Sequence, residues 1–397
     1  MPVPTSFVSI FFMIINMALG RIRSGRSEES CGASYVRNEW SVQSSTVFAD
    51  CGGANILADY RLTGWQSKRR TLSKDQRLDF ISAVRCLQSK SGKTSGTFAG
   101  VKSRYDDFVA LHITQADNVH WVGLLPSYDG SDVSLTQSAG TDTSYGYLNK
   151  LFETSVHMTD LYHWTQDAVD EASLLGSPIF DPKYGFGGNG DYIEDISNFP
   201  DEWVTDIDIP GRTGGGCLPN GPFAETNASM GPGRHTEYTP HCIRRDFSPW
   251  LMLRTLNTST INFVLNASSY FEFEHRIEGL TLGIEGVSVH SGGHLGIGGM
   301  IGDMANTWSS TVDPVFWVHH CAIDHLWDTW QREDWKSRRS DIGGPDTQWA
   351  YPYNYYGDKP YTNVTLDFAM DLGDIGGMVK IREVMDVHDS PLCFAYS

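Results

Sequence analysis

The chain has 397 residues, of which 40% are hydrophobic, and a formal net charge of −18. That length suits one large domain or two average ones, and 40 glycines favour a single loop-rich domain. The acidic balance, without any basic run, argues against binding to nucleic acid or to an anionic membrane. We therefore expect an acidic, soluble protein.

The N-terminus resembles a secretory leader. Residues 7–19 form a predominantly apolar run that is too short for a comfortable membrane span, and small residues stand near its end at Ala18 and Gly20. We predict a signal peptide over residues 1–20, secretion, and no membrane contact after cleavage. A positively charged start is missing, so a membrane anchor or a buried helix is the alternative. Four glycosylation triplets agree with export and begin at Asn227, Asn257, Asn266 and Asn363.

Seven cysteines in an exported chain predict two or three disulfides with one cysteine left over. Their pairing cannot be deduced from the sequence.

Two helices are predicted in the first third of the chain. Ser73 caps the first, which continues as an amphipathic stretch over Asp79–Leu87. The second opens at Ser103, has acidic residues in its first turn, and places Phe108 and His112 on one face. Residues 41–69 have no clear periodicity and are predicted to be a surface loop or non-coding sequence retained in the gene model.

The most informative stretch runs from His290 to Gln331. His290 and His294 stand at i and i+4, so both imidazoles can reach one point from one helix face. A second helix is predicted to start with Asp313 as N-cap and Pro314 in the first turn. Its inward stripe contains His320 and the apolar residues Phe316, Ile323, Trp327 and Trp330.

Periodicity alone leaves two alternatives open. His319 lies on a stripe of its own with Val315, Ala322 and Leu326, and a single histidine on an apolar stripe is often an ordinary core residue. The spacing cannot choose between His319 and His320.

The composite pattern HSGGH followed by DPVFWVHHCAID resembles the second copper motif of the type 3 copper proteins, namely tyrosinases, catechol oxidases and molluscan-type hemocyanins. The resemblance implies that His290, His294 and His320 bind one copper ion. The segment RYDDFVALH is similar to the first copper motif, which implies that His112 and His120 bind a second copper ion. The N-terminal segment and PHCIRRD resemble the secreted fungal branch.

The resemblance breaks after His120. Relatives continue through a Trp-His-Arg segment whose histidine completes the first copper site, whereas this chain has Tyr128 or Asp129 at that position. Residues 127–160 are rich in Ser, Gly, Thr and Asp, which disfavours a buried helix. His157 or His163 could substitute. A misjudged splice junction and a real loss of the ligand are both open.

The family implies a mainly α fold over residues 21–397, with a central four-helix bundle holding a dicopper site, long loops and a small β-rich closing segment near residues 363–385. It also implies a copper-dependent oxidoreductase that oxidises phenols or o-diphenols to o-quinones with dioxygen. Alternatives are an oxygen carrier, and a catalytically impaired protein with only the second copper site intact. The sequence does not predict the oligomeric state.

Glu278 and Ser291 are the candidate catalytic residues. The resemblance assigns Glu278 to orienting a water near the site, and places Ser291 where many monophenol-hydroxylating relatives have Asn. Because Ser is the weaker acceptor, diphenol oxidation is favoured. Gly292 and Gly293 disfavour a helix by about 1 kcal/mol each, which suggests that substrate approaches the metal closely there.

Overall fold

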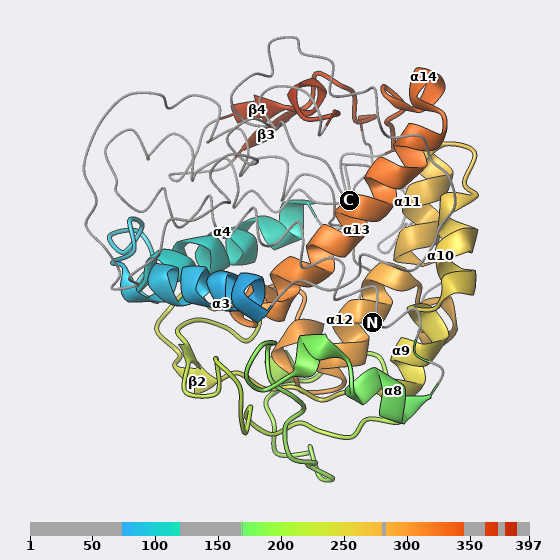
Figure 1. The fold of residues 1–397 in the computed structure, drawn as a ribbon. Coiled ribbons are helices and arrows are strands. Elements are labelled where there is room, and N and C mark those ends of the chain that lie inside the picture. The colour runs from blue at the N-terminus through green and yellow to red at the C-terminus, as the bar shows by residue number, and fades with distance from the viewer. Residues whose placement is uncertain are drawn as a thin grey trace.

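The computed structural model describes residues 74–119, 168, 170–279, 283–344, 362–371 and 378–386 (Figure 1). The predicted signal peptide, residues 41–69 and residues 127–160 lie outside this part of the chain. Within the described ranges, no helix is both long enough and apolar enough to cross a membrane.

Helices dominate the described residues, and the predicted mainly α fold is confirmed. The α-helices are α3 (Lys74–Ser89), α4 (Arg104–Val119), α8 (Glu171–Leu175), α9 (Pro249–Thr255), α10 (Thr258–Leu265), α11 (Tyr270–Glu278), α12 (Val289–Gly298), α13 (Val315–Glu333) and α14 (Trp335–Arg338). Short 3₁₀ turns include η2 (Pro178–Phe180), η3 (Asp201–Trp203), η4 (Ile284–Gly286), η5 (Asp303–Ala305), η6 (Ser310–Val312) and η8 (Ile381–Glu383).

Strands are few and short in the described part. β1 (Asn227–Ala228) pairs antiparallel with β2 (His241–Cys242), and β3 (Ala369–Asp371) pairs antiparallel with β4 (Met378–Lys380). The second pair lies in the predicted closing segment. A disulfide joins Cys217 to Cys242, and Cys86 is also disulfide-bonded. The Cys321 thiol is buried and lies 2.8 Å from the Trp317 carbonyl oxygen.

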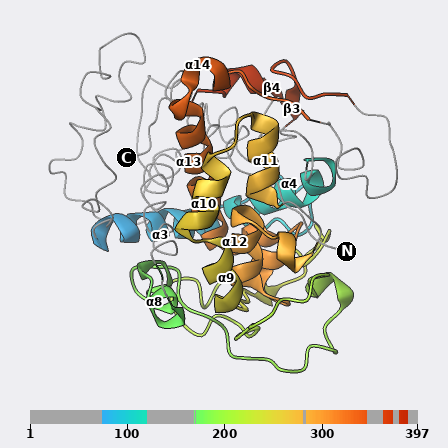
Figure 2. The ribbon, with the colours of Figure 1, turned by 90° about the vertical axis from the view of Figure 1, so that its right-hand side faces the viewer.

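Helix α12 lies at the centre of the helical part, against α9, α11 and α13 (Figures 1 and 2). All of its residues are buried. Helix α4 packs on α13 through Tyr105 and Phe108, whose rings meet the Trp317 ring edge-on at centroid distances of 6.0 and 6.4 Å. The Trp317 indole N–H also donates to the Tyr105 hydroxyl at 2.8 Å. These contacts fix α4 relative to α13.

Glycines allow α9 and α12 to approach closely. A Cβ atom at Gly292 would lie 2.1 Å from the Thr255 Oγ1 atom, and one at Gly296 would lie 2.4 Å from the Met252 Cγ atom. The prediction that Gly292 clears space for substrate is therefore wrong, because its open side faces α9. The packing of α9 on α12 requires glycine at this position.

The start of α13 differs by one residue from the prediction. The helix begins at Val315, with Pro314 rather than Asp313 as its N-cap. The Asp313 carboxylate accepts the Val315 N–H at 3.1 Å, but its main partner is Arg245, whose Nε and Nη2 atoms lie 2.7 and 2.9 Å from it. Both side chains are completely buried. An ion pair, rather than a cap, thus holds the first turn of α13 in place.

Candidate metal centre

Four histidines from two helices form a buried cluster. His290 and His294 come from α12 and His319 and His320 from α13, and one nitrogen of each lies within 4.8 Å of those of the others. The Nε2 atoms of His294 and His320 are 3.0 Å apart. Both predicted helices therefore direct imidazoles to one interior point.

Hydrogen bonds set the tautomers of the α12 histidines. His290 Nδ1 lies 3.0 Å from each carboxylate oxygen of Glu278, at the end of α11. His294 Nδ1 lies 2.7 Å from the carbonyl oxygen of Met304, in η5. Because these oxygens can only accept, each Nδ1 carries the proton, and each Nε2 keeps a lone pair for a metal. A carboxylate behind a ligating imidazole is a common arrangement in metal sites.

The two adjacent histidines of α13 have different partners. His319 Nε2 lies 3.0 Å from the His290 carbonyl oxygen, so it donates there and holds the backbone of α12. His320 Nε2 instead faces His294 Nε2, and its ring stacks on Phe316 at a centroid distance of 4.0 Å. This geometry favours His320 as the ligand. His319 instead supports the backbone of α12.

His112 of α4 reaches the same region. It is buried, and its Nδ1 lies 2.5 Å from the Trp308 carbonyl oxygen. Its ring meets the Phe316 ring edge-on at 5.4 Å, so Phe316 contacts both His112 and His320. Helices α4, α11, α12 and α13 thus all supply side chains around the cluster, in agreement with the predicted four-helix arrangement.

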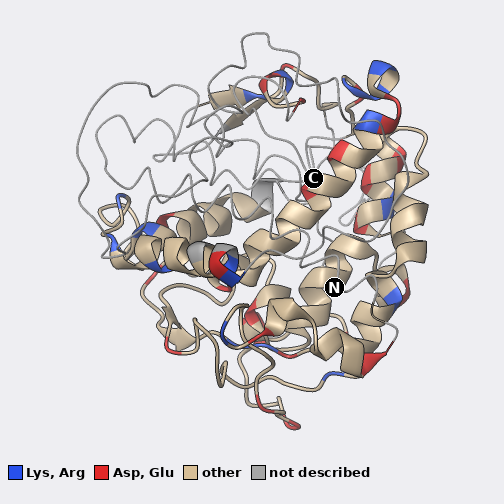
Figure 3. Cartoon of the chain, viewed as in Figure 1, with Lys and Arg blue, Asp and Glu red and all other residues tan. Residues whose placement is uncertain are grey.

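Four of these imidazoles, those of His112, His294, His319 and His320, are neutral at physiological pH. Burial lowers the pKa of His112 and of His294 to about 4. Burial, followed by the charges of the neighbouring imidazoles, lowers the pKa of His319 and His320 well below the usual value. Helix α12 carries no Lys, Arg, Asp or Glu, as Figure 3 shows. Neutral imidazole donors without a carboxylate among them suit copper, so the residues fit the metal that the sequence predicts.

Comparison with known proteins shows what the whole chain is similar to. The common central domain of tyrosinase matches residues 153–333. Tyrosinase P from Aspergillus terreus is 29% identical over 342 residues, which cover 82% of this chain and 90% of that protein. An N-acetyl-6-hydroxytryptophan oxidase from Emericella nidulans is 29% identical over 381 residues, covering 89% and 96%. A polyphenol oxidase variant from Thermothelomyces thermophila superposes with a TM-score of 0.60 at 27% identity, covering 82% and 87%.

The chain is tyrosinase-like: residues 153–333 match the tyrosinase central domain, and most of its length resembles fungal tyrosinase-like proteins. It is therefore an oxidoreductase of the copper-oxidase class. The match to the tyrosinase central domain begins at residue 153, so it contains the second copper motif but neither His112 nor His120.

The two candidate catalytic residues of this tyrosinase-like chain lie beside His290. The Glu278 carboxylate is bound to the His290 Nδ1 atom, and the Ser291 hydroxyl donates to the Glu278 carbonyl oxygen at 2.7 Å. Both side chains are buried. These bonds orient His290 and join α11 to α12, while the catalytic role predicted for the pair stays a prediction.

The remaining predicted site residues lie outside the described part of the chain. These are His120, the substituted position Tyr128 or Asp129, and the alternatives His157 and His163. The composition of the first copper site, His112 included, therefore stays a prediction.

The backbone acceptors of the site histidines could not be predicted from the sequence. The connection between α12 and α13 supplies the Met304 carbonyl to His294 and the Trp308 carbonyl to His112. Every residue has a carbonyl, so no residue type marks these positions. Only the path of the chain after α12 brings them to the imidazoles.

Proposed function

We propose that this tyrosinase-like protein oxidises o-diphenols to o-quinones with dioxygen, using copper held by histidines. The observation that carries the proposal is the cluster of buried imidazoles in which His290, His294 and His320 meet and which His112 approaches from α4. His290, His294 and His320 would hold the second copper ion, and His112 and His120 would contribute to the first.

Copper, when bound, supplies the electron transfer between the diphenol and dioxygen. The chain orients the imidazoles and excludes water from the site. Glu278 and the Met304 carbonyl keep the Nδ1 protons of His290 and His294 in place, so both Nε2 atoms stay directed inward. The Phe316 ring stacks on the His320 ring and meets the His112 and His294 rings edge-on, which limits the access of water to this side of the cluster.

The environment of Ser291 supports diphenol rather than monophenol oxidation. Its hydroxyl proton is committed to the Glu278 carbonyl at 2.7 Å, and the Glu278 carboxylate is committed to His290. Neither group is set to take the proton from a bound monophenol, whereas an o-diphenol is oxidised more easily. The substrate proposed is therefore a small phenolic compound. The Emericella nidulans relative, named an oxidase of a hydroxylated tryptophan, supports this class.

Export and glycosylation belong to the same proposal. The Asn227, Asn266 and Asn363 side chains are exposed. The Asn257 side chain instead caps α10, and its Nδ2 donates to the Leu253 and Arg254 carbonyls at 3.1 and 2.7 Å. Recovery of a glycosylated chain cleaved near Gly20 from culture medium would support export, and recovery of an uncleaved cytosolic chain would contradict it.

The second candidate function is a copper-binding protein with only the second site intact. It is favoured by the substituted third-ligand position and by a tyrosinase match that begins after the first motif. Oxygen ligands there would favour Cu(II) over the Cu(I) that dioxygen requires.

Copper content and catechol turnover of the purified chain test both functions. We expect more than zero but fewer than two coppers per chain, with slow turnover. Two coppers with rapid turnover would show that His157, His163 or another group completes the first site. Copper without any turnover would support the second candidate, and absence of copper would contradict both.

A further inference from the structure

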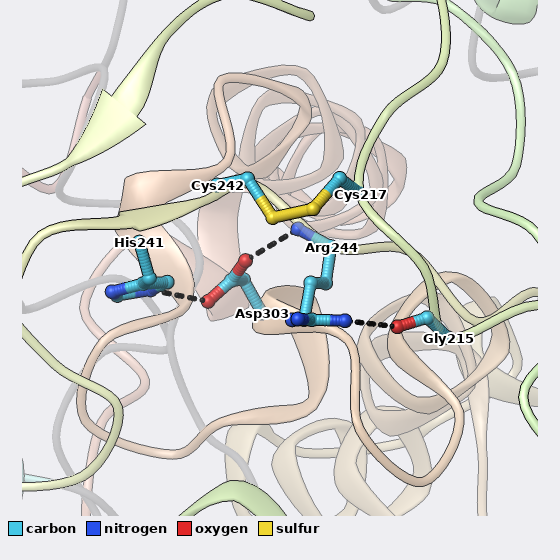
Figure 4. The surroundings of a disulfide bond; sticks show 6 residues. All are labelled: Gly215, Cys217, His241, Cys242, Arg244 and Asp303. Carbon is cyan, nitrogen blue, oxygen red and sulfur yellow. Dashed lines mark hydrogen bonds and ion pairs between the residues drawn. A yellow bond between two sulfur atoms is a disulfide. The ribbon is translucent and has the colours of Figure 1, made fainter.

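Asp303 joins a disulfide-anchored loop to the segment behind the second copper site. It is the first residue of η5 and is 4% exposed. One carboxylate oxygen lies 3.2 Å from His241 Nε2, and the other accepts the Arg244 backbone N–H at 2.7 Å (Figure 4). The Asp303 N–H also donates to the Arg244 carbonyl at 3.0 Å.

The loop that holds Asp303 is itself fixed. His241 and Cys242 form β2, and the disulfide from Cys242 to Cys217 anchors this strand (Figure 4). The Arg244 guanidinium donates to the Gly215 carbonyl at 2.9 Å. Asp303 therefore binds to a rigid support.

His241 has acceptors at both ring nitrogens. Its Nδ1 lies 2.9 Å from the Thr239 carbonyl oxygen, and its Nε2 faces the Asp303 carboxylate. Neither oxygen can donate, so both contacts form together only when the ring carries two protons. The geometry thus selects the imidazolium, which makes the contact with Asp303 an ion pair.

The residue that follows Asp303 in the chain carries a group that orients a proposed ligand. The carbonyl of the next residue, Met304, accepts the Nδ1 proton of His294 at 2.7 Å. Anchoring Asp303 therefore limits where this carbonyl can lie. Because His294 Nε2 is the atom directed to the copper, a shift of the carbonyl turns the donor away.

We propose that His241 and Asp303 form a positioning pair that holds the Met304 carbonyl against His294 and so sets the affinity of the second copper site. The role in copper affinity rests on the proposed function. The orientation of the His294 ring does not, because it is a property of the metal-free chain.

The pair is expected to respond to pH. Burial lowers the pKa of His241, but the hydrogen bond and charge of Asp303 outweigh this and raise it above 6.5 overall, with Arg244 as the opposing charge. Asp303 and Arg244 are the charged groups that face His241 in the described residues. A raised histidine pKa means that the ion pair is complete below pH 6.5 and is lost as pH rises through the raised value.

The first test measures copper loss to a chelator as a function of pH. At pH 6, His241→Gln should lose second-site copper on the order of tenfold faster than the unmodified chain. The difference should shrink at alkaline pH, where His241 is neutral. His235→Gln is the matched control, because His235 is 48% exposed and lies 3.6 Å from both Glu202 and Glu237. If His241→Gln lost copper at the same rate as the unmodified chain at every pH, the proposal would be overturned.

The second test needs no metal. In copper-free protein with ¹⁵N-labelled histidine, the slowly exchanging Nδ1 proton of His294, identified by its loss in His294→Asn, should be sharp in the unmodified chain and in His235→Gln. This proton signal should broaden at pH 6 in His241→Gln. It should also broaden in Asp303→Asn, which serves as the second variant if His241→Gln does not fold. Broadening in a chain that binds no copper would support the positioning pair and contradict the proposed function. Copper binding without broadening in either variant would overturn the positioning pair.

Discussion

The second-copper half of the centre draws its proposed ligands from one stretch of sequence, whereas the first-copper half begins with His112 on a helix much earlier in the chain. His290, His294 and His320 come from α12 and α13, which pack directly against each other. His112 reaches them only because α4 packs on Trp317. One half therefore depends on local spacing, and the other depends on tertiary contacts.

The connection between α12 and α13 links the two halves. It supplies the Met304 carbonyl to His294 and the Trp308 carbonyl to His112, so one backbone segment orients one imidazole of each half. A disturbance of this segment should affect both copper sites, whereas a change in α4 should affect the first site alone.

The largest effect is expected from removing a proposed ligand of the second half. His320→Ala should abolish copper binding at the second site, because it removes the Nε2 atom that faces His294. His319→Ala should largely retain copper, because its Nε2 donates to the His290 carbonyl instead. Copper content after dialysis, measured for both variants, checks this. Retention by His320→Ala together with loss by His319→Ala would show that the ligand is the other member of the pair.

The sequence predicted the second half well, because helix spacing puts His290 above His294 and the stripe of α13 carries His320. It could not choose between His319 and His320 by periodicity, since both stripes of α13 are buried. The mainly α fold followed from the family resemblance. The Arg245–Asp313 pair and the carbonyls of Met304 and Trp308 could not be predicted, because their partners are distant in sequence and carry no local signal.

The next largest effect should come from the ion pair that fixes the start of α13. Arg245→Met leaves the Asp313 carboxylate buried and without its cation, and loss of one partner of a buried pair costs about 3–5 kcal/mol. Arg254→Met is the matched control, because Arg254 and Glu285 are 53% and 79% exposed and such pairs contribute about 0–1 kcal/mol. Urea unfolding of both variants measures the difference. Equal stability of the two variants would mean that Arg245 does not hold α13.

Acid should destabilise the metal-free chain through both halves. The pKa of His112 and of His294 is lowered from 6.5 to about 4, so the folded chain resists protonation that the unfolded chain accepts. This contribution is complete above pH 6.5 and is lost as pH falls towards 4. Each histidine accounts for up to about 3 kcal/mol over that range.

Unfolding free energies measured from pH 7 to pH 4 check this contribution. The dependence on pH should be shallower in His112→Asn and in His294→Asn than in the unmodified chain. His235→Gln, at an exposed position, should leave the dependence unchanged. If all four chains gave parallel curves, the buried imidazoles would not be the groups that titrate.

The smallest effect concerns the packing of α12, and its sign is informative. Replacing a helical glycine by alanine usually stabilises a helix by about 1 kcal/mol. Gly292→Ala should instead destabilise the chain by about 1–3 kcal/mol, because the new Cβ would lie 2.1 Å from the Thr255 Oγ1 atom and 2.5 Å from its Cβ. Gly96→Ala, which meets no atom within 4 Å, is the control and should be nearly neutral. Because Gly292 faces α9, the KM for catechol should not change in any active variant. A stable Gly292→Ala chain with a raised KM would show that this glycine lies on the substrate side of the helix.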